Sequence, residues 1–443
     1  MKVCFYYAAI SVFLITACSP SKITTETLPD KRTTVKVPPT VPRASTPEVS
    51  NDVFIQQLLS RYPQFFDSIL KNKDVNNVQI IYTQINRRED QTPILTNHYF
   101  NVNKNRYYYP ASTVKLPTVA LALQRLNELK DKGINKTTTI ITEAGYSGQT
   151  PVYNDPLTPD GKPNIASYIK RILLVSDNDA FNRLFEFLGP DYINGQLHKM
   201  GYPDVQIRHR LSIPLTPDEN LHTNPINFFD NNNNLVYAQL MMVNQGKYSP
   251  RQDSLGKFVM NNGTLVPGPM DFSKKNRLGL EDLHNILRSL IFPNSVAPKQ
   301  RFNLSPEDYA FIYKYMSSYP SESIYPMYDT ATYYDAYAKF LFYGAQKTPV
   351  SKSIRIFNKV GDAYGQLTDV AYITDPSKNV EFFLSATMFC NSKGIINYED
   401  GYEYEKVGYP FFKNLGKVFY DYELTRSRKV KPDLVGFKIN YDK

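Results

Sequence analysis

The sequence predicts an α+β fold, because apolar residues follow strand patterns near both ends of the folded part and recur at helical spacing between them. The strand-like segments are 78–85, part of 94–102, 354–374 and 380–390. The helical segments are 54–70, 112–130, 165–173, 178–188 and 411–424. Residues from about 52 to 426 are enough for one large domain or two closely packed lobes, with a cleft between the lobes.

The first residues have the pattern of a secretion signal. Lys2 precedes an apolar stretch from Phe5 to Ala17 that is too short to remain as a membrane-spanning helix. The stretch ends in Ile15-Thr16-Ala17-Cys18 and resembles a bacterial lipobox. The resemblance implies that residues 1–17 are removed and that Cys18 carries a diacylglycerol, which anchors the protein in a membrane. An ordinary secretory signal with an incidental cysteine is the alternative.

The segments that flank the folded part are predicted to be accessory. Residues 18–51 are rich in Pro and Thr and poor in large apolar residues, so they are expected to form a disordered tether. Ser19 follows the cysteine, which by bacterial sorting rules favours the outer membrane, with the protein facing the periplasm. Residues 427–443 form a C-terminal extension. With Cys18 acylated, Cys390 has no partner for a disulfide.

Composition excludes several classes of function. The net charge is +9, from 51 basic and 42 acidic residues that are interspersed along the chain. The sequence has no basic-aromatic nucleic-acid motif, no zinc-type Cys/His spacing and no glycine-rich phosphate loop. We therefore expect no nucleic-acid partner, no metal and no cofactor. The sequence does not predict the oligomeric state.

A serine and a lysine stand three residues apart where a helix is predicted to begin. Ser112 and Lys115 precede an apolar run at helical spacing and so share one helix face. An amine there can take the proton of the serine hydroxyl, while N–H groups of the first turn face the group that the serine attacks. The spacing alone is weak evidence, since four other Ser-x-x-Lys pairs occur, starting at Ser19, Ser68, Ser167 and Ser254.

Two further motifs follow in order. Ser176-Asp177-Asn178 lies 64 residues after Ser112, directly before a helical pattern, and Lys359-Val360-Gly361 ends a strand-like run. S-x-x-K, S-D-N and K-T-G in this order are the signature of class A β-lactamases and penicillin-binding proteins. On these residues the chain resembles the superfamily of serine β-lactamases and DD-peptidases, and most of all its class A-like serine hydrolases.

The resemblance implies an antiparallel sheet of terminal strands flanked by helices, with an internal all-helical lobe. It makes Ser112 the nucleophile, Lys115 the base and Ser176 a proton relay. Lys359 would supply positive charge that lowers the pKa of Lys115. Substrate-binding residues are then Asn178, Val360, Gly361 and Asp362, and the backbone N–H groups of Ser112 and Asp362 form an oxyanion hole.

Two departures from the family pattern bear on the substrate. Val360 replaces the usual Thr or Ser and Asp362 adds negative charge, so both disfavour an acidic substrate. The segment 208–211, where class A enzymes carry the glutamate that activates water, contains no carboxylate. Asp218 or Glu219 could substitute for it. Without a substitute, an acyl-enzyme would persist, as in penicillin-binding proteins.

The distance between the second and third motifs indicates insertions. Ser176 and Lys359 are 183 residues apart, which is more than compact class A enzymes use. The excess lies near 227–277, which looks like a loop region, and near 318–348, which is rich in tyrosine and could cover the cleft.

Three functions remain open from the sequence. The leading one is a serine hydrolase that acts on a β-lactam or a peptidoglycan-like peptide, without a choice between the two. A second is a weakly active or silent lipoprotein that binds a cell-wall peptide. A third is a structural lipoprotein that docks an envelope partner through its aromatic insertions. The presence of all four of Ser112, Lys115, Ser176 and Lys359 favours the first.

Overall fold

The computed structural model of this chain describes residues 51–443. The predicted signal peptide of residues 1–17, the lipidation site Cys18 and nearly all of the tether 18–51 lie outside the described residues. In the part that is described, no helix combines the length and the apolar character needed to cross a membrane.

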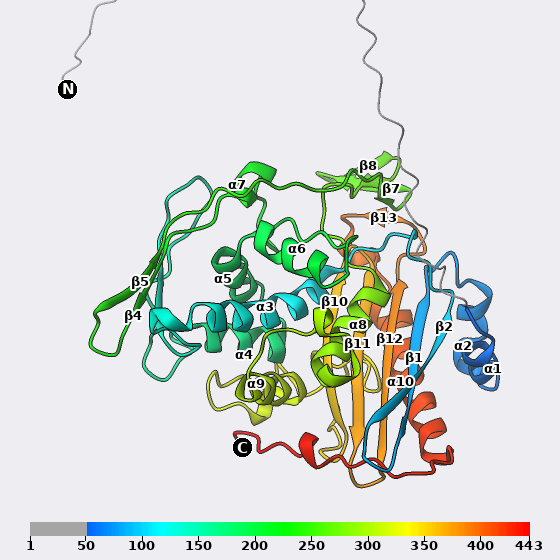
Figure 1. The fold of residues 1–443 in the computed structure, drawn as a ribbon. Coiled ribbons are helices and arrows are strands. Elements are labelled where there is room, and N and C mark those ends of the chain that lie inside the picture. Colours follow the sequence, from blue (N-terminus) through cyan, green and yellow to red (C-terminus); the bar gives the residue numbers. More distant parts are fainter. Residues whose placement is uncertain (1–50) are drawn as a thin grey trace, which may run out of the picture. The chain divides into compact units, whose positions relative to one another are not determined.

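A five-stranded antiparallel sheet joins the two ends of the described chain (Figure 1). Its strand order is β10-β11-β12-β1-β2, with the strands at Gln79–Arg87 (β1), Pro93–Phe100 (β2), Arg355–Ala363 (β10), Gln366–Asp375 (β11) and Val380–Phe389 (β12). β1 lies against β12 with Ile81 opposite Ser385. The predicted α+β class and the antiparallel sheet of terminal strands are confirmed.

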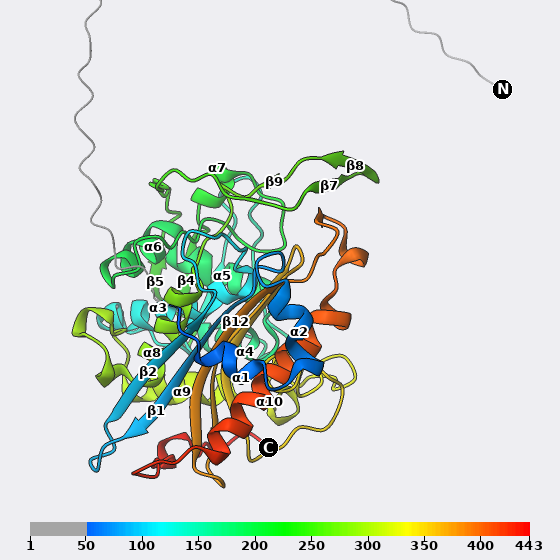
Figure 2. The ribbon, with the colours of Figure 1, turned by 90° about the vertical axis from the view of Figure 1, so that its right-hand side faces the viewer.

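Helices cover both faces of this sheet, which explains why its central strands are buried. Every residue of β11 and all but the last residue of β12 are buried, as expected for strands with covered faces. Three helices pack on one face, as Figure 2 shows: α1 (Phe54–Leu59), α2 (Pro63–Lys71) and α10 (Tyr409–Thr425). On the other face lie α8 (Leu280–Ile291) and the helical lobe.

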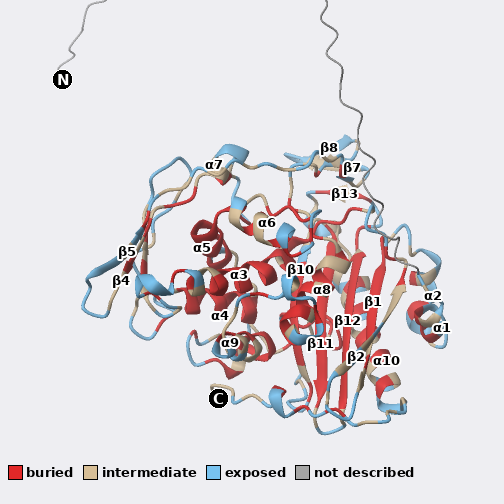
Figure 3. Ribbon diagram, in the orientation of Figure 1, coloured by how far each residue is buried: buried red, intermediate tan, exposed pale blue. Residues whose placement is uncertain are grey.

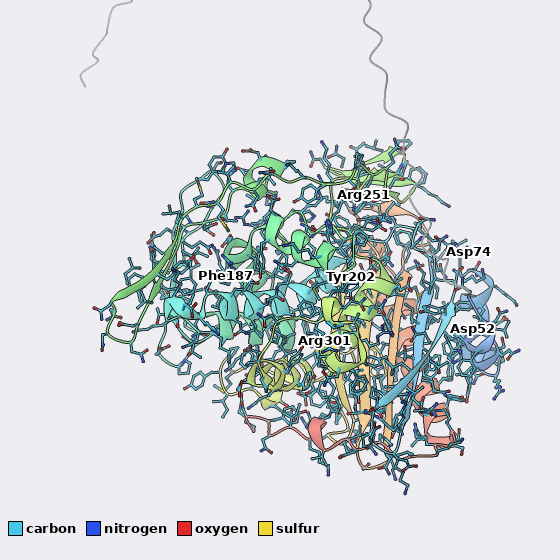
Figure 4. The ribbon with its side chains drawn as sticks, in the orientation of Figure 1. Asp52, Asp74, Phe187, Tyr202, Arg251 and Arg301 are labelled. Carbon is cyan, nitrogen blue, oxygen red and sulfur yellow. The ribbon has the colours of Figure 1, made fainter. Side chains whose placement is uncertain are left out.

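The single helix predicted over 54–70 is two helices. Pro63 begins α2, and the preceding Tyr62 has φ −125° and ψ 59°, outside the helical region. Proline disfavours a helical conformation in the residue before it, so α1 ends at Leu59. Just before α1, Asp52 accepts a hydrogen bond from the backbone N–H of Phe54 at 2.9 Å; Figure 4 labels it at this side of the sheet.

The helical lobe is built around one buried helix. Eleven of the 14 residues of α3 (Lys115–Glu128) are buried, because the other helices surround it, as the burial colours of Figure 3 show. These are α4 (Ile165–Val175), α5 (Asn178–Leu188), α6 (Pro190–Lys199) and α9 (Pro306–Ser317). A short helix, α7 (Pro217–Leu221), follows α6. The predicted helical lobe is present, but it is not all-helical, because it carries one three-stranded sheet at its edge.

Short strands replace the loop that was predicted over 227–277. β3 (Thr139–Thr142) pairs with β4 (Ile226–Phe229), which pairs with β5 (Leu235–Gln239). β7 (Phe258–Asn261) and β8 (Thr264–Pro267) form a hairpin that also pairs with β13 (Ile395–Ile396), and β6 (Ser254–Leu255) pairs with β9 (Met270–Asp271). Asn262 and Gly263 turn the β7–β8 hairpin with φ 47° and 80°. An Asn-Gly pair strongly favours such a turn, so the sequence contained a signal for this hairpin.

The second insertion and the C-terminal extension both pack on the sheet. Ala338, Phe340 and Leu341 are buried in the apolar cluster that contains α10. Phe437 is buried in the cluster of the opposite face, and its ring centroid lies 5.0 Å from that of Tyr372. Both segments are therefore parts of the hydrophobic core.

Candidate active site

Ser112 and Lys115 stand on successive turns where α3 begins. A 3₁₀ turn at Ala111–Val114 carries Ser112 and continues into α3 at Lys115. Ser112 is half-buried and lines a cleft, whereas the side chain of Lys115 is fully buried. Ala111 has a φ of 46°, a strained left-handed conformation for a residue with a Cβ. The backbone thus bends sharply just before the serine.

The Lys115 amine points at the Ser-Asp-Asn segment. Nζ donates to the backbone oxygen of Ser176 and, at 2.6 Å, to Oδ1 of Asn178; it lies 3.3 Å from Oγ of Ser176. Burial, reinforced by the charge of Lys359, holds the pKa of Lys115 well below its usual range. A neutral amine has two N–H groups and one lone pair. Three acceptors therefore surround the Lys115 amine, and the lowered pKa favours its neutral form, whose lone pair can accept a proton.

The Ser-Asp-Asn segment is a tight link between α4 and α5. Ser176 is left-handed, with φ 61°, and ends α4. Asp177 caps α5 by accepting a hydrogen bond from the N–H of Ala180 at 2.8 Å, and it also accepts one from Nε of Arg171 at 3.0 Å. These bonds fix the direction in which Ser176 and Asn178 face.

Lys359 connects the sheet to this segment. Its Nζ donates to Oγ of Ser176 at 2.7 Å and to the backbone oxygen of Val360 at 2.8 Å. The side chain is only 2% exposed. Burial lowers the pKa of Lys359 to about 7, although the carboxylates of Asp362 and Asp369 act in the opposite direction. All three motifs therefore meet around the Ser176 hydroxyl.

Gly361 allows β10 to approach the start of α3. A Cβ on this residue would lie 2.7 Å from the oxygen of Pro110 and 3.0 Å from the nitrogen of Ser112. Both distances are too short for any other residue without a shift of the backbone. Glycine therefore brings the backbone that leads into Asp362 next to the N–H of Ser112.

The two neighbours of Gly361 have different positions. Asp362 is exposed and lines the cleft. Val360 is 3% exposed and packs with the apolar cluster under α10, on the other face of the sheet. The side chain of Val360 therefore does not reach the cleft, and the sequence-based assignment of Val360 to substrate binding is corrected. Only its backbone oxygen takes part, as an acceptor for Lys359.

The cleft at Ser112 has a volume of about 610 Å³. The residues that line it come from the segment that leads into α3, the start of α5, the loop after α6, the end of β10 with the turn after it, and the segment after β13. They are Tyr109, Ala111, Ser112, Asn178, Leu211, Ser212, Asp362, Ala363, Tyr364, Asn397, Glu399, Tyr402 and Tyr404. The tyrosine-rich insertion 318–348, which could cover the cleft by the sequence analysis, contributes no residue to this lining.

The segment 208–211 brings no carboxylate to the cleft. Arg210 is buried in an ion pair with Glu186 at 2.9 Å, and the position next to Asn178 is taken by Ser212, whose Oγ accepts a hydrogen bond from Asn178 Nδ2 at 2.7 Å. Neither Asp218 nor Glu219 lines the cleft. Glu219 caps α7 instead, since its carboxylate accepts a hydrogen bond from the N–H of Thr216 at 2.8 Å.

Sequence reasoning missed much of the cleft wall. Tyr364 and Gly365, with φ 54° and 81°, form the tight turn between β10 and β11 directly after the third motif. Their position beside that motif was a usable signal. For Asn397 and Glu399 the sequence contained no such signal, because their position depends on the pairing of Ile395 with β7. Residues 51–443 contain no cluster of His, Cys, Asp and Glu that could hold a metal ion.

Comparison with known proteins identifies the class that this fold and site define. A model described as the beta-lactamase enzyme family matches residues 64–408. The chain therefore belongs to this family, within the superfamily of serine β-lactamases and DD-peptidases. No curated protein sequence matches the chain.

Solved structures with a similar arrangement are distant in sequence. A beta lactamase from Xanthomonas campestris is 12% identical, with 83% of this chain and 97% of that chain covered and a TM-score of 0.44. An ancestral class A beta-lactamase is 12% identical, with 83% and 100% covered and a TM-score of 0.42. The protein PBP-A is 16% identical, with 83% and 93% covered and a TM-score of 0.42.

Proposed function

We propose that the protein is a serine hydrolase that works through an acyl-serine intermediate on a β-lactam or a peptidoglycan-like peptide. One observation carries this proposal: Lys115, beside Ser112 on α3, has a buried amine of lowered pKa whose hydrogen bonds lead to Ser176 and on to Lys359. A cleft that only holds a ligand has no use for a basic amine placed in this way.

The proposed reaction begins when Ser112 Oγ bonds to the substrate carbonyl carbon and gives its proton to the lone pair of Lys115. The backbone N–H groups of Ser112 and Asp362 stabilise the resulting oxyanion. The Lys115 ammonium then passes a proton through Ser176, whose Oγ lies 3.3 Å away, to the departing nitrogen. The C–N bond breaks and Ser112 remains acylated. Asn178 orients the Lys115 amine throughout.

Hydrolysis of the acyl-enzyme is the slow step in this proposal. Neither Asp218 nor Glu219 lines the cleft, and 208–211 supply no carboxylate to activate water. We expect a β-lactam to acylate Ser112 once and the acyl group to be hydrolysed slowly. Product should then appear as one initial burst without sustained turnover. Intact-mass spectrometry after exposure to a panel of β-lactams measures both events. Rapid steady-state hydrolysis of a chromogenic cephalosporin would contradict slow deacylation.

The nucleophile is tested by labelling with a fluorescent penicillin and with a fluorophosphonate. Ser112→Ala should abolish both labels and keep the melting temperature of the wild type. Ser68→Ala is the matched control, since Ser68 also begins a Ser-x-x-Lys pair but lies exposed on α2. Labelling that survives in Ser112→Ala would refute the assignment. A wild type that no probe labels would favour the silent peptide-binding alternative.

Membrane attachment is a separate part of the proposal. The Ile15-Thr16-Ala17-Cys18 pattern supports lipidation of Cys18, and Ser19 supports an outer-membrane anchor with the protein facing the periplasm. Protein extracted from membranes should carry the diacylglycerol mass on Cys18, and Cys18→Ser should lose it. An unmodified Cys18 in the membrane-extracted protein would contradict lipidation.

A further inference from the structure

The charged residues that line the cleft at Ser112 all carry the same sign. Asp362 and Glu399 line it, and no lysine, arginine or histidine of the described chain does. Both carboxylates are exposed, and neither forms an ion pair with another residue of 51–443. Two acidic side chains therefore face whatever enters the cleft. Desolvation raises the pKa of Asp362, and the charges of Lys359 and Lys115 behind it act in the opposite direction.

The negative charge of the cleft lining is opposite in sign to the net charge of the whole chain. The chain has a net charge of +9, and a net positive field by itself attracts anions. A lining that followed the average composition would contain more basic than acidic groups. The acidic lining is thus a local property of the end of β10, which carries Asp362, and of the segment after β13, which carries Glu399.

The two lysines behind the cleft do not line it. Burial lowers the pKa of Lys359 to about 7 and holds that of Lys115 well below its usual range. Lys359 also donates to Ser176 Oγ and to a backbone oxygen. The two amines are engaged by Ser176 behind the cleft wall, whereas the carboxylates of Asp362 and Glu399 belong to the lining itself.

Four tyrosine rings complete the lining. The rings of Tyr109 and Tyr364 are 5.1 Å apart and those of Tyr402 and Tyr404 are 5.6 Å apart. The hydroxyl of Tyr402 accepts a hydrogen bond from the N–H of Asn397 at 3.0 Å, and that of Tyr404 accepts one from the N–H of Gly365 at 2.9 Å. These two hydroxyls are engaged by the backbone, so their residues offer the cleft mainly ring surface. Aromatic rings attract cations through their negative faces.

We infer that the substrate acylating Ser112 carries a cationic group, an ammonium or a quaternary ammonium, close to its reactive carbonyl. Carboxylates and tyrosine rings together bind such a group, and they repel a substrate carboxylate. The lack of a hydroxyl at Val360 fits this inference, because no side chain there is available to hold a carboxylate. The inference rests on the proposed acyl-serine function and specifies its substrate class.

Three p-nitrophenyl esters that differ in charge test the inference. They are the esters of trimethylammonio-butanoic acid, of its uncharged tert-butyl isostere and of glutaric acid. The burst of p-nitrophenolate should be fastest for the cationic ester, by about fivefold over the uncharged one, and slowest for glutarate. A glutarate or uncharged ester that reacts as fast as the cationic one would overturn the inference. If no ester acylates Ser112, the proposed function itself fails.

Variants of single acidic residues show which of them causes the preference for the cationic ester. Glu399→Gln should reduce the ratio of the cationic to the uncharged rate by about threefold to fivefold, and Asp362→Asn should act in the same direction. Asp400→Asn is the matched control, since Asp400 is exposed and adjacent in sequence but does not line the cleft. An equal loss in Asp400→Asn would show a general field effect and would contradict a cation site in the cleft.

Discussion

Two clusters of buried polar side chains lie on opposite faces of β10, and both contain lysine. The site cluster consists of Lys115, Ser176, Asn178 and Lys359. The Lys339 cluster consists of Lys339, Asn358 and Asp369. Successive side chains of a strand point to opposite faces, so the neighbours Asn358 and Lys359 place the two clusters back to back.

The Lys339 cluster is closed. Nζ of Lys339 donates to the backbone oxygens of Met316 and Ile356 at 2.8 and 2.9 Å and to Oδ1 of Asn358 at 2.7 Å, which uses all three N–H groups of an ammonium. Asn358 in turn donates to Asp369 at 2.9 Å. None of these side chains lines the cleft at Ser112. The cluster ties the second insertion to β10.

The difference between the clusters shows which feature, beyond a lowered pKa, allows a buried lysine to act in catalysis. Burial lowers the pKa of Lys339 to about 7, as it does for Lys359. A lowered pKa is therefore not what sets the site apart. The site cluster differs because Ser112 and Asn178 open onto a cleft, whereas no side chain of the Lys339 cluster does.

The largest expected effect comes from removing the amine of each cluster in turn. Lys115→Met should slow acylation of Ser112 by about 10²- to 10⁴-fold, the range for loss of a general base. Lys339→Met should retain acylation but lower the free energy of unfolding by about 1–3 kcal/mol, because three buried acceptors lose their donor. The labelling rate and the free energy of unfolding in urea are measured for each variant. If both variants lose the same fraction of the labelling rate, the two clusters do not differ in function.

A smaller effect is expected from the close approach of β10 to α3. In Gly361→Ala the new Cβ meets Pro110 and Ser112, so the backbone must shift, and a misplacement of about 1 Å can cost roughly 10²-fold in rate. Gly195→Ala is the control, since Gly195 lies within α6 with nothing within 4 Å of its Cβ position. The control should keep the wild-type labelling rate. Unchanged labelling in Gly361→Ala would show that the approach does not matter for the reaction.

The smallest effect is a pH dependence of stability. The pKa of Lys339 is about 7 in the folded protein and 10.5 ordinarily, so between these values the unfolded chain binds a proton that the folded one does not. Stability from this group therefore rises with pH over that window and is lost as the pH falls through about 7. Urea unfolding at several pH values should show the destabilisation by Lys339→Met growing as pH rises. A constant difference would contradict the lowered pKa of Lys339.

Much of the fold and the motif residues followed from sequence. The strands 78–85 and 380–390 correspond to β1 and β12, and the helix 178–188 is α5 as predicted. The motifs Ser112–Lys115, Ser176–Asn178 and Lys359–Gly361 were found because family chemistry fixes their spacing. The break at Pro63 and the turn at Asn262-Gly263 were also readable, since both depend on the backbone preferences of one or two residues.

The sequence by itself determined the order of the main-sheet strands and of the helices around the motifs, and the identity of the residues that meet at Ser176, because local patterns and motif residues act over short stretches of chain. Tertiary structure alone decided that Val360 faces the core, that 318–348 does not line the cleft, and that Glu399 does. These outcomes depend on which face of β10 meets which helix and on the pairing of β13 with β7. Such contacts join residues far apart in the chain, and no local preference specifies them.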